Sequence, residues 1–184
     1  MIIIKTIPSF LEKSECNNMI KEYSNLKLEQ AGYGDTDGNK KINKKQRDSN
    51  IIFIENSIIE NKIINELKTH ITIKGFDFIG LEKLQFTEYD VNGHYDWHTD
   101  SDENNLNKRY YSIVVPLNAD YTGGELICKN INKDDIILEK KTGNMHIFSS
   151  SLWHKVSPVL SGKRYSLVTW VSLEKNKNSK QSLI

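Results

Sequence analysis

The stretch Tyr89-Asp90-Val91-Asn92-Gly93-His94-Tyr95-Asp96-Trp97-His98-Thr99-Asp100 carries the signal that decides the fold. An Asn-Gly turn precedes a short strand, and two H-x-D triplets follow in close succession. Alternate residues of an extended strand share one face, so His98 and Asp100 can close on a single ion. The stretch therefore predicts a β-strand that ends in two metal ligands.

A third ligand has to come from another strand, because one imidazole and one carboxylate do not hold a metal tightly. His154, in the later segment Leu152-Trp153-His154-Lys155-Val156, is the natural candidate. Two histidines and one carboxylate are the facial set of Fe(II) oxygenases, which leaves three positions open. Zinc hydrolases use similar sets, so the ligand types alone do not decide the metal.

His94 is the competing ligand, because His94-Tyr95-Asp96 has the same H-x-D form and a regular strand would place it on the same face as His98. We prefer His98 because Asp100 ends the strand and opens a polar loop over 101–108, which leaves room for a substrate. His94 is then a polar residue near the mouth of the site. We expect His70 and His146 to be structural.

Strands and turns dominate the chain from Leu81 onward, with turn signals at Asn92-Gly93, Gly123-Gly124, Thr142-Gly143 and Ser161-Gly162. Short strands at this spacing, without helices between them, predict a β-sandwich or barrel. The expected strands cover 81–89, 94–98, 110–117, 124–128, 135–139, 144–148 and 165–173.

The first half of the chain predicts two amphipathic helices that pack outside the β-structure. The first covers about 15–25 with Ser14 as its cap, and the second about 58–70 with Ser57 as its cap. The apolar residues 1–4 predict an opening strand. Between the helices, the polar and glycine-containing segment 31–49 predicts a long mobile loop, a common place for a functional lid.

Length and composition indicate one ordinary globular domain of 184 residues. The net charge is +1, from 25 basic and 24 acidic residues, which argues against a general nucleic-acid binder. Two cysteines, Cys16 and Cys128, indicate no disulfide framework and favour a reducing compartment. No apolar run approaches the roughly 18 residues that span a bilayer. We therefore expect a cytoplasmic protein without a membrane partner.

Arg164 stands at the root of the apolar strand 165–173, where burial of an unpaired guanidinium would be costly. A bound dicarboxylate would supply the partner through a two-pronged hydrogen-bonded pair. An ordinary Arg–Asp bridge is the alternative explanation.

The spacing Tyr89-x3-Gly93-x-Tyr95-x2-His98-x-Asp100, then Gly123-Gly124-Glu125-Leu126, then His154-x-Val156-x-Pro158-x3-Gly162-x-Arg164 resembles the 2-oxoglutarate- and Fe(II)-dependent oxygenases. Within them it is most similar to the prolyl 4-hydroxylase superfamily, including small bacterial and phage members. The similarity is strong over residues 81–173 and looser before them.

The resemblance implies a mainly β fold with flanking helices, a double-stranded β-helix (a jelly roll, cupin-like). It implies one domain over 1–184, with helical support in 1–80, a catalytic jelly roll in 81–173 and a frayed tail in 174–184. It also implies Fe(II) bound by His98, Asp100 and His154.

The resemblance further implies a co-substrate pocket in which Arg164 pairs with the C5 carboxylate of 2-oxoglutarate and Ser166 assists. Tyr89 matches a pocket-lining tyrosine and Trp170 an aromatic position near the iron, although both, like Tyr95, would also fit as plain core aromatics. One departure is Pro116, which stands where some relatives carry a carboxylate-binding tyrosine. That role would fall to Ser112, Ser166 or water.

The implied activity is hydroxylation of a C–H bond with O₂ and 2-oxoglutarate, releasing succinate and CO₂, with ascorbate as the usual reductant. The superfamily favours a peptidyl proline or another residue of a protein substrate, which Arg47, Asp48 and Tyr95 would contact. A surface salt bridge is the alternative role for Arg47 and Asp48.

Two other functions remain open at this stage. An AlkB-type nucleic-acid demethylase would carry a second arginine where Trp170 stands, and the near-neutral charge also argues against it. A non-catalytic jelly-roll binding module would need neither the three ligands nor Arg164.

Overall fold

The computed structural model describes residues 3–34, 40–71, 76–101 and 109–175. Its helices are α1 (Lys13–Tyr23) and α2 (Ser57–His70). The remaining regular structure in these residues is β, in strands β1 (Ile4–Ile7), β2 (Glu29–Gln30), β3 (Tyr33–Gly34), β4 (Lys40–Lys41), β5 (Arg47–Asp48), β6 (Asn50–Ile54), β7 (Phe76–Leu81), β8 (Leu84–Tyr89), β9 (His94–His98), β10 (Arg109–Pro116), β11 (Thr122–Gly123), β12 (Leu126–Lys129), β13 (Asp135–Ile137), β14 (Met145–Ser149), β15 (His154–Val156), β16 (Val159–Ser161) and β17 (Arg164–Lys175).

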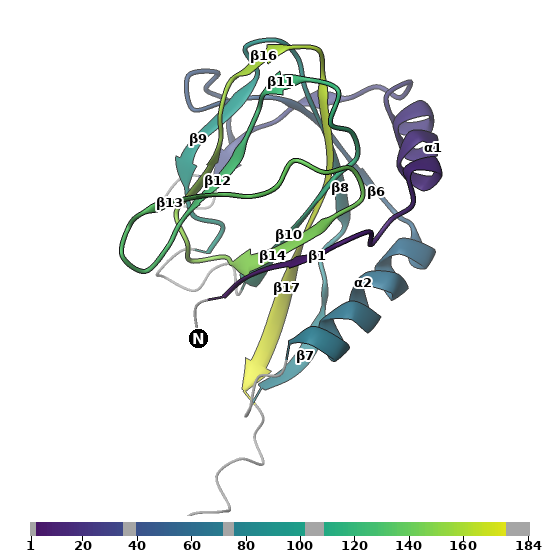
Figure 1. Ribbon diagram of the computed structural model, residues 1–184, viewed down its shortest axis with the longest axis vertical. Coiled ribbons are helices and arrows are strands. Elements are labelled where there is room, and N and C mark those ends of the chain that lie inside the picture. Colours follow the sequence, from purple (N-terminus) through teal and green to yellow (C-terminus); the bar gives the residue numbers. More distant parts are fainter. Residues whose placement is uncertain (1–2, 35–39, 72–75, 102–108, 176–184) are drawn as a thin grey trace, which may run out of the picture.

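Two antiparallel sheets form the body of the protein (Figure 1). The larger has the order β1-β14-β10-β17-β8-β6-β2, with β7 pairing the far part of β17, and the smaller has the order β13-β12-β15-β9-β5. Apolar side chains from both sheets pack together between them, among them Val114 and Phe148 from the larger sheet and Leu126 and Val156 from the smaller. The predicted double-stranded β-helix with flanking helices is confirmed.

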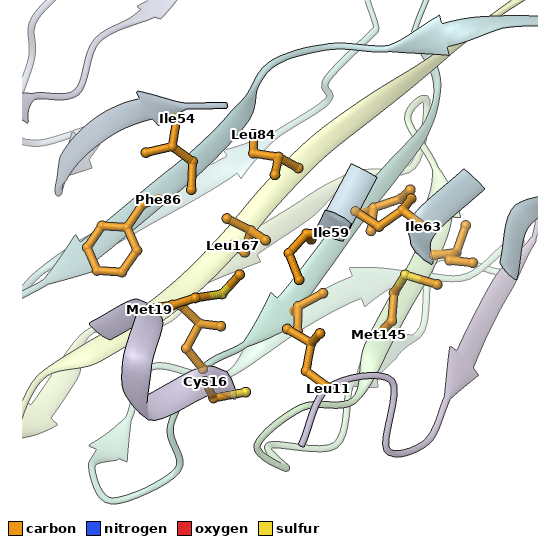
Figure 2. Close-up of a cluster of buried hydrophobic side chains, with 14 of the residues drawn as sticks. Leu11, Cys16, Met19, Ile54, Ile59, Ile63, Leu84, Phe86, Met145 and Leu167 are labelled. Carbon is orange, nitrogen blue, oxygen red and sulfur yellow. The ribbon is translucent and has the colours of Figure 1, made fainter. Parts of the chain in front are cut away.

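Both helices lie on the side of the larger sheet that faces away from β9, β12 and β13 (Figure 1). The helices pack their apolar faces into one core with the sheet (Figure 2). From α1 these residues are Cys16, Met19 and Tyr23, and from α2 they are Ile59, Ile63 and Leu67.

The helix starts differ slightly from prediction, because other residues satisfy the free backbone N–H groups. Glu15 accepts a hydrogen bond at 2.9 Å from the backbone N–H of Glu12, which caps the helix two residues before the expected Ser14. The side chain of Asn56 accepts at 3.1 Å from the Ile59 N–H. Ser14 and Ser57 therefore lie inside the helices.

Several expectations for the first half and the tail need correction. The segment 1–80 is not only helical support, since β1, β2, β6 and β7 add to the larger sheet. The described part of 31–49 forms short strands, and β5 pairs with β9 instead of lying in an open loop. The expected strand 81–89 is two strands, β7 and β8. In the tail, residues 174 and 175 still pair with β7.

A β-bulge in the smaller sheet changes which residues of β9 share a face. His154 pairs with His98, but Val156 pairs with Tyr95, so β9 has one residue more than β15 over the same length. Such an extra residue reverses the alternation beyond it. Tyr95, rather than His94, consequently lies on the pocket side with His98, which overturns the expectation from a regular strand.

No helix among the described residues is long and apolar enough to cross a membrane.

Candidate functional site

Three side chains meet where β9 and β15 pair. One nitrogen from each of His98 and His154 and one oxygen of Asp100 all lie within 4.8 Å of one another. The Nε2 of His154 is 3.2 Å from Oδ2 of Asp100, and the Nε2 of His98 is 3.6 Å from Oδ1. The structure therefore brings together the three residues that the sequence singled out, and their donor atoms could surround one metal ion.

Backbone hydrogen bonds hold the three ligand residues in place. The register of the smaller sheet sets His98 opposite His154, and the Asp100 N–H donates to the Ser150 carbonyl at 2.9 Å just after β9 ends. Ser150 directly follows β14, so the larger sheet holds the end of β9. The triad thus depends on both sheets.

The imidazole tautomers follow from a contact that each histidine makes two residues back along the chain. Nδ1 of His98 lies 2.8 Å from the Asp96 carbonyl oxygen, and Nδ1 of His154 lies 2.9 Å from that of Leu152. A carbonyl oxygen only accepts, so Nδ1 carries the proton and donates. Nε2 of each ring is therefore the nitrogen that faces Asp100 and that would bind a metal.

Burial and mutual charge shape the protonation of the three residues. Burial and the neighbouring His154 lower the pKa of His98 to about 3, so this imidazole is neutral. Burial would also lower the pKa of His154, but Asp100 raises it. Burial favours the protonated form of Asp100, yet the two imidazoles and the Ser112 hydroxyl more than offset it and hold its pKa well below the ordinary value.

Ser112 lies beside the metal cluster rather than beside the co-substrate arginine. Its hydroxyl donates to Oδ2 of Asp100 at 2.6 Å and lies 2.9 Å from the Ser150 hydroxyl. Ser112 is fully buried and does not line the pocket. Its contact in the structure is with Asp100, and a contact with the co-substrate stays a prediction.

A pocket of about 300 Å³ opens beside the cluster, between the two sheets. Its apolar wall includes Val114, Leu126, Val156 and Val168. Its polar and aromatic lining includes the metal cluster and Arg47, Gln85, Tyr89, Tyr95, Arg109, Arg164, Ser166 and Trp170. The described wall therefore combines a metal-ligating group with three arginines.

Arg164 is 2% exposed and lines this pocket. It donates through one terminal nitrogen to the Ser166 hydroxyl at 2.9 Å, and its Cζ lies 5.0 Å from the Tyr89 ring centre. Its Nε has no hydrogen-bond partner among the residues that the structure describes. No carboxylate of residues 3–34, 40–71, 76–101 or 109–175 pairs with it, which removes the Arg–Asp bridge as an explanation within that part of the chain.

Trp170 also lines the pocket, and its buried indole N–H has no hydrogen-bond partner in the described part of the chain. The Arg109 guanidinium lies 3.9 Å from the centre of its ring and makes two 2.6 Å bonds to the Glu82 carboxylate. Sequence reasoning missed Arg109. In a regular strand Arg109 and Val114 would point to opposite faces of the sheet. A bulge between Arg109 and Tyr111 turns Arg109 to the pocket face.

Arg47 and Tyr95 form a stack on the metal cluster. The Arg47 guanidinium lies 4.5 Å from the Tyr95 ring centre, and that ring stacks on His98 with centroids 3.5 Å apart. Arg47 is buried and donates to Ser49 and to the Gly32 carbonyl. Asp48 instead forms an ion pair with Lys44 at 3.4 Å. Of the two residues expected to contact the substrate, Arg47 therefore lines the pocket and Asp48 does not.

The remaining histidines take no part in this cluster. Both ring nitrogens of His94 lie next to carbonyl oxygens, of Asn92 and Lys45. His146 is buried, between the Thr6 hydroxyl and the Glu139 carbonyl, and His70 pairs with Glu66.

The sequence is similar to those of known iron oxygenases. A family model described as the 2OG-Fe(II) oxygenase superfamily matches residues 84–172. A PKHD-type hydroxylase of Prochlorococcus marinus strain NATL2A is 29% identical over 170 residues, covering 89% of this chain and 75% of that protein. Another, from strain MIT 9515, is 30% identical over 120 residues, and the match spans 64% of this chain and only 50% of that relative's length.

Solved structures share the fold. A prolyl hydroxylase from Trichoplax adhaerens, in complex with a hypoxia inducible factor peptide fragment, matches with a TM-score of 0.76 at 16% identity, covering 92% of this chain and 83% of that one. A Pseudomonas putida prolyl-4-hydroxylase matches with a TM-score of 0.71 at 17% identity, covering 92% and 91%.

The residues that the family model matches contain the whole His98–Asp100–His154 cluster and Arg164. Over these residues, just under half of the chain, the protein is similar to the 2OG-Fe(II) oxygenase superfamily, and together with the PKHD-type relative this supports an enzyme that uses Fe(II) and 2-oxoglutarate.

Proposed function

We propose that the protein hydroxylates a C–H bond of a residue within a peptide or protein, most simply a peptidyl proline. The observation that carries the proposal is that a His–Asp–His cluster and an unpaired buried arginine line one pocket. The hydroxylase names of the relatives and the peptide bound to the Trichoplax adhaerens enzyme support a protein substrate.

The residues present fit both groups that this function requires. Two imidazole nitrogens and one carboxylate suit Fe(II) and leave coordination positions free. The Arg164 Nε and the Trp170 indole N–H are buried donors without a partner among the described residues, which is costly unless a bound molecule accepts from them. We infer that 2-oxoglutarate supplies those acceptors.

In this scheme the Nε2 atoms of His98 and His154 and the Asp100 carboxylate hold the metal. When bound, Fe(II) and 2-oxoglutarate supply the oxidising chemistry: 2-oxoglutarate loses CO₂, and one oxygen atom of O₂ enters the resulting succinate while the other enters the substrate. Ascorbate is the expected reductant. The chain's own part is to orient the ligands through the Asp96 and Leu152 carbonyls.

Arg164 would bind the distal carboxylate, with Ser166 and the face of Tyr89 fixing the guanidinium. The valine and leucine side chains of the pocket keep water away from the reacting groups, which strengthens this pairing. Arg47, Tyr95 and Arg109 line the same pocket and are the side chains that we assign to the substrate.

We further infer a single domain over residues 1–184 in the cytoplasm. The two sheets share one apolar interior, and the helices pack on the larger sheet. Both cysteines are buried and unpaired, in keeping with a reducing compartment.

The first experiment is an anaerobic titration of the protein with Fe(II) and 2-oxoglutarate, following the visible charge-transfer band of the chelate. We expect a band in the wild type, its loss in His98→Ala, and a weaker band at equal 2-oxoglutarate in Arg164→Ala. His94→Ala is the matched control, because it removes a histidine of the same motif outside the cluster, and it should keep the band.

Substrate class is then tested by succinate release above the uncoupled background. Proline-containing peptides should stimulate turnover, and methylated oligonucleotides should not. Folded, metal-loaded protein without a band would reject the oxygenase function, whereas stimulation only by oligonucleotides would reject the peptide substrate.

A further inference from the structure

The three arginines that line the pocket differ in what meets their charge. Arg109 makes two 2.6 Å bonds to the Glu82 carboxylate, so its charge is already paired. Arg164 has no carboxylate partner among the described residues, and the proposed function gives it the distal carboxylate of 2-oxoglutarate. Arg47 is therefore the pocket arginine whose charge still lacks a partner.

Arg47 is 8% exposed, and its described contacts are all with neutral groups. Its Nε donates to the Ser49 hydroxyl at 3.0 Å, and one terminal nitrogen donates to the Gly32 carbonyl at 3.1 Å. Its guanidinium also lies over the Tyr95 ring. In the part of the chain that the structure describes, no carboxylate forms an ion pair with it. Because a buried charge without an opposite charge is costly, an anionic group should bind here.

The other charges of the loaded pocket balance one another. Fe(II) carries two positive charges and Arg164 carries one, while the Asp100 carboxylate and the two carboxylates of 2-oxoglutarate carry three negative ones. Glu82 balances Arg109. The pocket that receives the substrate therefore keeps the single positive charge of Arg47. The apolar part of the wall strengthens the pairing of this charge with an anion.

Arg47 lies close to the metal cluster. The Tyr95 ring contacts both the Arg47 guanidinium, at 4.5 Å from ring centre to Cζ, and the His98 ring, at 3.5 Å between centroids. His98 would bind the metal at which the substrate C–H bond reacts. An anionic group that Arg47 binds therefore belongs to the reacting residue of the substrate or to one of its near neighbours.

We propose that Arg47 selects substrates with a carboxylate next to the reacting residue, so that the preferred substrate is an acidic peptide. The inference deepens the proposed function and rests on it, because a peptide is taken to enter this pocket. A peptide offers such a carboxylate on an Asp or Glu side chain or at its C-terminus, and the guanidinium fork would bind either one.

The test is the dissociation constant of matched proline peptides, measured by anaerobic calorimetry on protein loaded with Fe(II) and 2-oxoglutarate. In one set both ends are blocked, and Asp or Asn stands near the proline. In the other set the side chains are neutral, and the nearby C-terminus is free or amidated. We expect the wild type to bind the acidic member of a pair about tenfold more tightly, as hydrogen bonds to a charged group imply. Added salt should leave most of this preference in place, because buried pairs are screened less than surface pairs.

Three variants assign the preference to one side chain. Arg47→Gln should bind both members of the pair about equally, and Arg47→Lys, which keeps the charge without the fork, should keep part of the preference. Lys44→Gln is the matched control, because it removes an exposed positive charge from the same segment, and it should keep the whole preference. The chelate band shows that each variant is folded and loaded.

A preference that disappears in Arg47→Gln supports the inference, and the set of peptides that shows it identifies the source of the carboxylate. Equal binding of acidic and neutral peptides by the wild type, or an unchanged preference in Arg47→Gln, would overturn the inference and leave the peptide substrate in place. If the chelate band forms but no peptide binds, the peptide substrate of the proposed function fails, and this inference fails with it.

Discussion

Single hydroxyl and carbonyl groups orient the three ligand side chains, although none of them would contact the metal itself. The Ser112 hydroxyl reaches Asp100 from β10, in the sheet opposite the two histidines. It accounts for part of the low pKa of Asp100, because it donates to the charged form. It also restricts rotation of the carboxylate that the metal would need.

We therefore expect Ser112→Ala to weaken Fe(II) binding about tenfold to a hundredfold, the usual effect of removing a partner of a metal ligand. The measurement is an anaerobic metal titration with and without 2-oxoglutarate. Ser161→Ala, which removes an exposed hydroxyl that contacts Thr122 in a separate two-stranded sheet, should leave the affinity unchanged. Intact metal affinity with a selective loss of 2-oxoglutarate binding would instead return Ser112 to the co-substrate role that the sequence suggested.

At the scale of elements, His94 joins the two-residue strand β5 to β9. Its Nδ1 lies 2.9 Å from the Asn92 carbonyl oxygen and its Nε2 lies 3.1 Å from that of Lys45. Carbonyl oxygens only accept, so both contacts are hydrogen bonds only when the imidazole carries two protons. Burial lowers the pKa of His94, but these carbonyls and the nearby Asp48 and Asp96 outweigh it, so the net shift is upward.

A raised folded-state pKa means that the contribution of His94 to stability is complete below its unfolded pKa, about 6.5, and is lost as pH rises through the folded value. We expect His94→Gln to lower the free energy of unfolding by about 1 kcal/mol at low pH, the worth of one hydrogen bond, and by less at high pH. Urea unfolding of both proteins between about pH 5 and 9 checks this. A difference independent of pH would show that folding does not shift the pKa of His94.

The same scale shows where sequence patterns succeed and where they fail. Arg164, Ser166 and Trp170 alternate regularly along β17 and all line the pocket, as period-two reasoning predicts. The bulges in β9 and β10 break that period, so regular alternation predicts neither Tyr95 nor Arg109 on the pocket face, and only the family resemblance pointed to Tyr95. A bulge depends on how two strands pair, and one strand's residues do not specify it.

At the scale of the whole molecule, the metal ligands lie on β9, just after it and on β15, while the chain between these strands enters the larger sheet twice, at β10 and at β14. Motif spacing could place His154 in the triad, because ligand chemistry demands a third donor. The order β14-β10-β17-β8 could not be predicted from composition or periodicity, since neighbouring strands are far apart in sequence.

A metal held between these strands should stabilise the folded state, because the unfolded chain has no such site. We expect Mn(II) with 2-oxoglutarate to raise the unfolding free energy by about 2.7 kcal/mol at a ligand concentration of 100 times Kd. Thermal unfolding measures the effect, and a chelator should reverse it. In His154→Ala the stabilisation should disappear. An equal stabilisation in that variant would mean that the ion binds elsewhere.

β17 pairs along both of its edges, with β10 on one side and with β8 and β7 on the other, whereas β5 has only two residues at the margin of the smaller sheet. Amide protons exchange with solvent deuterium only when their segment opens, and doubly paired strands open last. The strands that line the pocket should therefore differ in how readily they open. We therefore expect amide protons of β17, which carries Arg164 and Trp170, to exchange last, and those of β5, which carries Arg47, to exchange earlier.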